Sequence, residues 1–316
     1  MNGMSGTKKI IISVILMLTG IVLGFLHAKS LGVSLFEEQV HTVAINSEAD
    51  IADMGESFHN NICTLESDIK VTKLSSLASG EFPFVGVFDG QGHTITLTGD
   101  VDQSLFGYIG KYGVVKNLNI EVYTLCNFDA KVGAILALEN EGKIINCRIN
   151  VNNVSVSNNG SYAAVVAKNS GHIENVYTKV SFNNSVSSSA KRSVIGGIAA
   201  YNYGVITSSI SEIRYNGFDE AEKENIYNGT TLNTSLGAVY GSNEQGTVDT
   251  CAAVIEETAY VADERNQNIF FATSDERQNV FSEGMLFGTL GFDNNRWVYK
   301  NSTLTLIEGE ENEYNK

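Results

Sequence analysis

The stretch VGAILALENEGKIINC, residues 132–147, contains the unit from which the fold can be predicted. A run of small apolar residues leads into a polar pair and a glycine, and a β-branched residue and an asparagine follow. The same order returns in YAAVVAKNSGHIENV (162–176) and IGGIAAYNYGVI (195–206), and more loosely in LFGYIGKYGVVKNL (105–118) and LGAVYGSNEQGTV (236–248). Self-similarity at such intervals indicates a repeat architecture.

The turn glycines set the period, with successive spacings of 29, 29, 33 and 42 residues. These glycines are Gly113, Gly142, Gly171, Gly204 and Gly246. The position two residues after each glycine is always β-branched: Val115, Ile144, Ile173, Ile206 and Val248. The position four residues after each glycine is always small and hydrogen-bonding: Asn117, Asn146, Asn175, Ser208 and Thr250.

Short β-branched runs between glycines and asparagines are typical of strands. One unit of about 30 residues cannot bury its own apolar face, but units stacked about 4.8 Å apart can. The sequence therefore predicts an all-β fold, a parallel β-solenoid of about five or more coils. The Asn/Ser/Thr column is expected to form a structural ladder at an inward or corner site, bonded to turn backbone groups.

The chain begins with a membrane-directing segment. Residues 10–26 carry no charge and follow Lys8 and Lys9, which favours an N-terminal hydrophobic helix. The segment is either a signal peptide, cleaved near Ser30, or a membrane anchor, and both place the remaining chain outside the cell. The expected organisation is therefore a signal or anchor over 1–30, a stalk and N-terminal cap over 31–80, solenoid repeats over 81–270, and a C-terminal cap with an acidic tail over 271–316.

The charge balance excludes one class of partner. The 316 residues include 21 Lys and Arg against 36 Asp and Glu, a formal net charge of −15. Nucleic-acid grooves need clustered cations, so neither DNA nor RNA is expected as a partner.

The cysteines and a C-terminal aromatic group give two structural predictions. Cys147 and Cys251 share one repeat position but lie three coils apart, about 14 Å, so we expect them to be buried and unpaired. Trp297, with Phe292 and Tyr299, is expected to cover the far end of the solenoid.

The repeat units resemble the GLUG-motif proteins of bacterial surfaces. The better copies are residues 132–147 and 195–206, while FPFVGVFDGQGHTITL (82–97) is similar to the opening segment of such proteins and LGFDNNRW (290–297) to their closing segment. The fourth and fifth units depart from the pattern, with Ser208 and Thr250 in place of asparagine. The resemblance implies a surface-exposed solenoid that makes contacts, and it does not imply any activity of the repeat itself.

One motif, DGQGH at residues 89–93, resembles the catalytic turns of β-helical polysaccharide hydrolases and lyases. Such chemistry needs further carboxylates on the same face, and the adjacent repeat columns offer none. A tight turn, with Asp89 bonded to local amides and His93 leading into a strand, is the favoured interpretation, and no catalytic residue is assigned.

Acidic loops raise the question of calcium. Asp100 and Asp102, or the group Asp219, Glu220 and Glu222, could supply oxygen ligands, but neither has the spacing of a calcium loop. The histidines are scattered singly, so no transition-metal site is predicted. No cofactor is expected.

Recognition is expected on loops and exposed aromatic residues. The insertion 211–235 contains Tyr-Asn-Gly twice, and further tyrosines lie nearby in the repeat. The predicted ligand-contact residues are Tyr201, Tyr203, Tyr215, Asn216, Tyr227 and Asn228.

The sequence thus favours a non-enzymatic solenoid of a bacterial cell surface that mediates adhesion, with a glycan or a surface protein as partner. A polysaccharide-active β-helix enzyme and a structural component of the cell envelope are the alternatives. The oligomeric state is left open.

Overall fold

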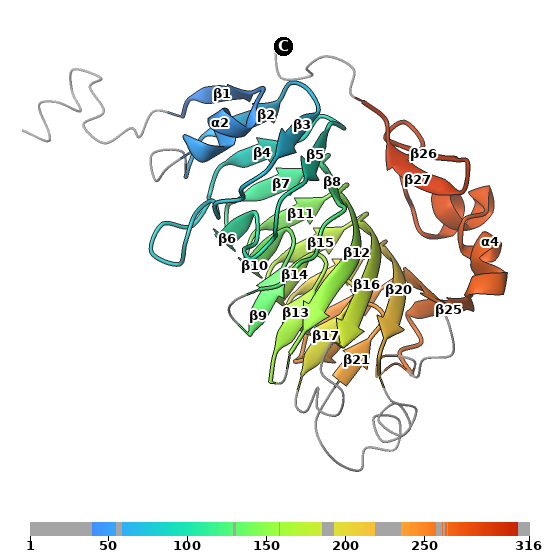
Figure 1. Ribbon diagram of the computed structural model, residues 1–316. Helices are drawn as coiled ribbons and strands as arrows, with labels where there is room; N and C mark the ends of the chain where they lie inside the picture. Colours follow the sequence, from blue (N-terminus) through green and yellow to red (C-terminus); the bar gives the residue numbers. More distant parts are fainter. Residues whose placement is uncertain are drawn as a thin grey trace, which may run out of the picture. The chain divides into compact units, whose positions relative to one another are not determined.

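A computed structural model shows that the chain forms a parallel β-solenoid of about five turns (Figure 1). The structure describes residues 40–54, 59–128, 131–157, 159–184, 193–218, 235–256, 261, 263 and 265–308, and those from Thr42 onward belong to one compact unit. Within these ranges, no helix is long and apolar enough to span a membrane. The segment 10–26, with the helix expected there, lies outside the described residues.

The described strands form four parallel sheets that run along the solenoid. Sheet A contains β1 (Thr42–Ile45), β2 (Ile62–Leu65), β4 (Val87–Asp89), β7 (Val114–Lys116), β11 (Lys143–Ile145), β15 (His172–Glu174), β19 (Val205–Thr207) and β23 (Thr247–Asp249). Sheet B contains β3 (Ile69–Val71), β5 (Thr94–Leu97), β8 (Asn119–Val122), β12 (Arg148–Val156), β16 (Tyr177–Asn184), β20 (Ile210–Asn216), β24 (Cys251–Glu256) and β25 (Ile269–Thr273).

Sheets C and D complete each turn. Sheet C contains β6 (Phe106–Ile109), β10 (Ala137–Asn140), β14 (Val166–Asn169), β18 (Ala199–Asn202) and β22 (Tyr240–Asn243). Sheet D contains β9 (Val132–Ala134), β13 (Ser161–Ala163), β17 (Val194–Gly196) and β21 (Ser235–Gly237). The remaining elements are α2 (Glu48–Ala52), η2 (Ser274–Glu276), α4 (Arg277–Val280), the π-helical η3 (Gly284–Thr289), and an antiparallel hairpin of β26 (Trp297–Lys300) and β27 (Thr303–Leu306).

The predicted apolar column is confirmed. Val115, Ile144 and Ile173 are direct partners on neighbouring strands, and the pairing continues to Ile206 and Val248. Each of these side chains is at most 3% exposed. Because a parallel register places equivalent residues over one another, the fixed spacing from the turn glycine builds a continuous core.

The winding begins earlier than residue 81. Strand β1 pairs in parallel with β2, and β2 pairs with β4, so sheet A already starts at Thr42, inside the range expected as a stalk and cap. The column of the core extends through Phe88 to Cys63, both fully buried. The strands β1 and β2 lie before the repeats that contain the turn glycine. Their pairing register depends instead on the alternation of buried and exposed side chains along each strand.

The predicted Asn/Ser/Thr column lies at the corner between sheets A and B. All five residues adopt left-handed backbone angles, with φ between 50° and 53°. The Nδ2 of Asn146 donates to Asn117 Oδ1 at 3.3 Å, but Asn175 Oδ1 is buried without a hydrogen-bond partner within the described residues. Asparagine tolerates the left-handed region better than most residues, so backbone conformation explains this column more fully than a ladder does.

A second asparagine column, not identified from the sequence, is a buried ladder at the end of sheet C. Asn140 Nδ2 donates to Asn169 Oδ1, Asn169 Nδ2 to Asn202 Oδ1, and Asn202 Nδ2 to Asn243 Oδ1, at 2.8, 2.8 and 3.0 Å. The first three of these asparagines are at most 1% exposed. The sequence feature that could have identified this ladder is an asparagine two positions before the turn glycine. In two of the coils the N–H of that glycine donates to the Oδ1 of the asparagine.

Residues 274–308, here called the C-terminal strap, pack along the outward face of sheet B (Figure 1). Phe281, Leu286 and Trp297 belong to one apolar cluster with Tyr177 and Ile210 of that sheet. The expectation that Trp297, Phe292 and Tyr299 cover the far end is therefore wrong. Outward-facing apolar residues of sheet B need a cover, and the strap supplies it along the side of the solenoid.

A buried ion pair fixes the strap to sheet B. Arg277 of α4 donates from Nε and Nη2 to the carboxylate of Glu212 on β20, at 2.7 and 2.6 Å. Glu212 is 1% exposed and also accepts a hydrogen bond from the Tyr177 hydroxyl. The Arg277 Nη1 donates to the Tyr299 hydroxyl on β26 at 2.9 Å. The guanidinium of α4 is therefore bonded both to sheet B and to the hairpin of the strap.

All four cysteines are free and buried, and the prediction that Cys147 and Cys251 do not pair is confirmed. Burial raises the pKa of both thiols to about 12. The thiols therefore act as small apolar side chains in the core.

Candidate functional site

The DGQGH turn has the structure of a tight corner. Asp89 Oδ1 accepts hydrogen bonds from the Gln91 N–H and from Asn117 Nδ2, both at 3.0 Å, while its Oδ2 pairs with Lys116 Nζ at 3.0 Å. Gln91 and Gly92 have φ of 50° and 84°. Every described contact of this carboxylate thus serves the turn and the neighbouring coil, as expected for an Asx-type turn.

The predicted ligand-contact residues do not form one surface. Tyr201 and Tyr203 lie on and just after β18 of sheet C, and Tyr203 is 47% exposed. Tyr215 is 3% exposed, stacks on Phe182 and donates its hydroxyl to the Gly237 carbonyl at 2.8 Å. The prediction for Tyr215 is therefore wrong, because its alternation within β20 points it into the core.

The other predicted ligand-contact residues, and the acidic residues considered as calcium ligands, lie elsewhere. Asn216 Nδ2 donates to Asn183 Oδ1 at 2.9 Å, and Asn183 Nδ2 donates to Asn153, so Asn216 belongs to a cross-strand amide column on sheet B. Tyr227 and Asn228 lie outside the described residues, as do Asp219, Glu220 and Glu222. Asp100 and Asp102 are exposed and take part in no metal-binding group of the described chain.

The structure instead gathers four tyrosines on one lateral surface, here called the tyrosine face. Tyr108 lies on β6 and Tyr201 on β18, both facing outward from sheet C, and Tyr112 and Tyr203 follow these strands one position before the turn glycine. Two strands separate β6 from β18, which places the two pairs about 14 Å apart along the solenoid. Tyr112 is 75% exposed.

A charged pair lies between the tyrosines. Glu139 on β10 and Lys168 on β14 are in register with Tyr108 and Tyr201, and their carboxylate and ammonium groups are 3.1 Å apart. Both side chains are more than two-fifths exposed. A hydrogen bond with Glu141 raises the pKa of Tyr108 to about 12, so the phenol stays protonated and is held beside that carboxylate.

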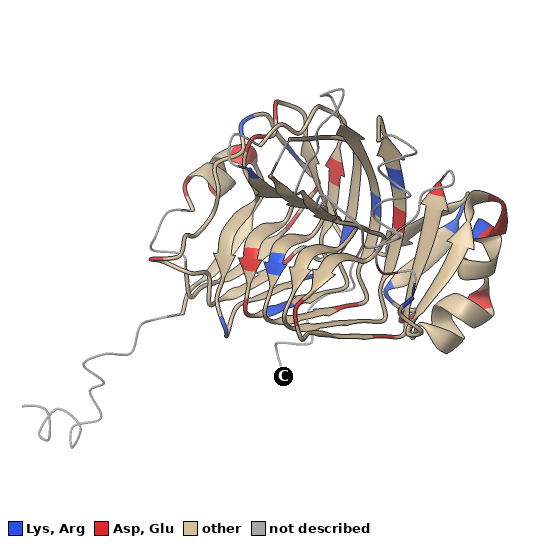
Figure 2. Cartoon of the chain, turned by 90° about the horizontal axis from the view of Figure 1, so that it is seen from below, with Lys and Arg blue, Asp and Glu red and all other residues tan. Residues whose placement is uncertain are grey.

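The face thus combines aromatic rings with hydrogen-bonding and charged groups on a rigid support. Figure 2 shows basic and acidic residues interspersed along the described strands. Tyrosine supplies a large contact area with little loss of side-chain entropy, and it is enriched where proteins bind other proteins.

The comparisons with known proteins support the fold. No family model matches the chain, and no curated protein matches it. The crystal structure of a "putative immunoglobulin A1 protease" from Bacteroides ovatus is similar, with a TM-score of 0.55 and 16% sequence identity over 87% of this chain and 94% of that chain. At this level of identity the similarity shows a common β-solenoid fold.

Proposed function

We propose that this chain is an exported, non-enzymatic β-solenoid of a bacterial cell surface that binds a glycan or a surface protein through its tyrosine face. One observation carries the proposal: Tyr112 and Tyr203 are exposed at equivalent corners of the repeat, three coils apart, and a tyrosine of sheet C accompanies each. Two tyrosine pairs held about 14 Å apart on a rigid solenoid suit an extended ligand.

Two further points support this proposal. The repeat units resemble GLUG-motif surface proteins, in which such coils make contacts. In addition, the carboxylate of Asp89, in the one motif that resembles a catalytic turn, is engaged by Lys116, Asn117 and the Gln91 N–H. A catalytic acid or base needs a partner carboxylate on the same face, and the turn uses this one for its own conformation.

The test is binding of the full-length protein, in mild detergent, to an array of glycans and extracellular matrix proteins. We expect Tyr112→Ser and Tyr203→Ser each to weaken binding roughly fivefold or more, because such aromatic contacts contribute about 1 kcal/mol each. Tyr123→Ser is the matched control: Tyr123 is 67% exposed but follows β8 of sheet B, away from the tyrosine face.

Three outcomes would contradict the proposal. An equal loss in Tyr123→Ser would mean that exposed tyrosines bind without a defined surface. If the protein binds no member of the array, a structural role in the cell envelope would be favoured. Polysaccharide turnover that disappears in Asp89→Asn would identify an enzyme.

A further inference from the structure

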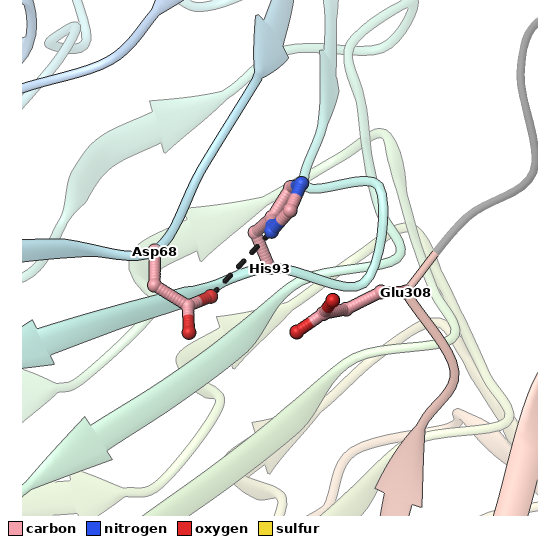
Figure 3. Close-up of side chains that lie close together, drawn as sticks. All are labelled: Asp68, His93 and Glu308. Atoms are coloured by element: carbon pink, nitrogen blue, oxygen red, sulfur yellow. Dashed lines mark ion pairs between the residues drawn. The ribbon is translucent and has the colours of Figure 1, made fainter.

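Three side chains with metal-ligating atoms meet beside the first coils: Asp68, His93 and Glu308 (Figure 3). One ligand atom from each lies within 4.8 Å of the other two, and within the described residues this is the one group of three such side chains. Asp68 and Glu308 are exposed and His93 is half-buried, so solvent ions reach the group. These residues come from three segments of the chain that the fold alone brings together.

The first two residues each lie one position before a strand of sheet B. Asp68 lies between β2 and β3, and its Oδ1 accepts the Thr94 N–H at 2.8 Å, which orients the carboxylate. His93 precedes β5, and its backbone N–H donates to the Gly90 carbonyl at 2.8 Å while its own carbonyl accepts the Asn119 N–H at 3.1 Å. Backbone hydrogen bonds thus fix the position from which the His93 side chain projects, and the Thr94 N–H orients the Asp68 carboxylate directly.

The C-terminal strap delivers the third residue. Glu308 follows β27, and the backbone before it packs against Gly92, the neighbour of His93. A Cβ at Gly92 would lie 2.4 Å from the Ile307 carbonyl oxygen, and Gly92 has φ of +84°, so only glycine permits this approach. The Ile307 N–H donates to the Arg296 carbonyl at 2.8 Å, which holds this end of the strap in place.

The geometry suits a small divalent cation. His93 Nδ1 and Asp68 Oδ1 are 3.5 Å apart, close to the edge of about 3.4 Å in a tetrahedron with metal–ligand bonds of about 2.1 Å. The Glu308 carboxylate lies within 4.8 Å of both atoms, so it would have to move closer to serve as the third protein ligand, and a fourth position would remain for water. An imidazole nitrogen with two carboxylates favours Zn²⁺ over Ca²⁺, which prefers oxygen ligands alone.

We propose that Asp68, His93 and Glu308 form a Zn²⁺ site that fastens the end of the C-terminal strap to the first coils of the solenoid. The sequence predicted no such site because its histidines stand alone in the chain. The ligands become neighbours only when sheet B stacks Asp68 beside His93 and the strap runs back along that sheet.

The experiment is calorimetric titration of the full-length, chelator-treated protein with ZnCl₂. We expect saturable binding that is weakened roughly tenfold or more by each of Asp68→Asn, His93→Asn and Glu308→Gln. Asp68→Asn keeps an oxygen that can accept the Thr94 N–H, and the melting temperature without zinc reports whether each variant is folded. The matched control is His172→Gln: His172 Nε2 lies 3.0 Å from Glu174 Oε2, a similar pair without a third ligand within the described residues.

A second readout tests the fastening itself. Zn²⁺ should slow proteolytic removal of the strap in the natural protein and leave the rate unchanged in Glu308→Gln. The proposal is overturned if the protein shows no saturable zinc binding, if Glu308→Gln binds zinc as tightly as the natural chain, or if His172→Gln loses as much affinity as His93→Asn.

Discussion

Replacement of Asn169 by alanine tests whether the buried asparagine ladder stabilises the solenoid. The Asn169 side chain is fully buried, and it donates from Nδ2 to Asn202 Oδ1 at 2.8 Å. Its Oδ1 accepts from Asn140 Nδ2 at 2.8 Å and from the Gly171 N–H at 3.3 Å. The amide therefore links three consecutive coils and the turn that follows its own strand.

The expected cost follows from the groups that lose a partner. In Asn169→Ala, the Asn140 Nδ2, the Gly171 N–H and the Asn202 Oδ1 each lose a hydrogen bond in a buried position. An unsatisfied buried group costs about 1–3 kcal/mol, and water entering the vacated space would offset part of this. We expect the free energy of unfolding to fall by about 3–5 kcal/mol.

The assay is urea-induced unfolding followed by circular dichroism and by the fluorescence of Trp297. Ser170→Ala is the matched control, because Ser170 is the next residue, is exposed and makes no described side-chain hydrogen bond; its effect should stay within about 0.5 kcal/mol. The reasoning is refuted if Asn169→Ala costs less than about 1 kcal/mol, since the ladder would then be a by-product of stacking.

Three further predictions concern the strap, a corner and a buried acid. Arg277→Ala leaves the Glu212 carboxylate buried without its cation, so we expect a loss of about 3–5 kcal/mol and faster proteolysis of the strap; unchanged proteolysis would contradict the role of the ion pair. Thr250→Gly, at φ of 51°, should raise stability by about 0.5–1 kcal/mol because a β-branched residue is strained there, whereas Thr247→Gly in β23 should lower it; a loss in both would argue against strain. Burial raises the pKa of Asp263 from 3.8 to about 6, so its contribution to stability is full below about pH 4 and is lost as the pH rises through 6. The difference is up to about 3 kcal/mol, and Asp263→Asn should remove this decline from chemical denaturation curves measured between pH 4 and 7; an unchanged decline would assign it to other groups.

The sequence predicted the features that recur in every coil of the solenoid. A glycine-anchored β-branched position must lie over its equivalents in a parallel solenoid, so the column from Val115 to Val248 followed from spacing alone. The start of the winding did not follow, because β1 and β2 pair through alternating burial without the turn unit. Local pattern also misplaced Tyr215, whose direction depends on the strand register and not on its Asn-Gly neighbour.

The two asparagine columns show a limit of periodicity. A column of like residues shows that the residues share an environment, but it does not identify that environment. Both a buried hydrogen-bonded ladder and a corner with left-handed backbone angles favour asparagine. The replacement of asparagine by Ser208 and Thr250 in the corner column, against the unbroken Asn140, Asn169 and Asn202, separates the two cases. The amide ladder needs a donor and an acceptor at every step, whereas a corner needs only a residue that accepts positive φ.

Contacts between distant segments could not be predicted from the repeat. The strap folds back along sheet B, so Glu308 meets His93 and Trp297 Nε1 lies 3.5 Å from Asn146 Oδ1. Nothing in the periodic part of the sequence encodes where a non-repeating segment packs, because its partners are outward-facing residues that the stacking leaves variable.

That variability also supports the assignment of the tyrosine face to binding. Inward columns keep one chemical class, apolar or amide, because each side chain packs on its equivalents, but the outward column of sheet C reads Tyr108, Glu139, Lys168, Tyr201 and Ser242. Such a mixture forms no ladder and contributes little to stacking, and Tyr112 is too exposed to stabilise the core. Substitution of Tyr112 should therefore change unfolding by less than about 0.5 kcal/mol. Stability thus places little constraint on Tyr112, and the proposed binding function would account for an aromatic side chain at a position where solvent contact favours polar ones.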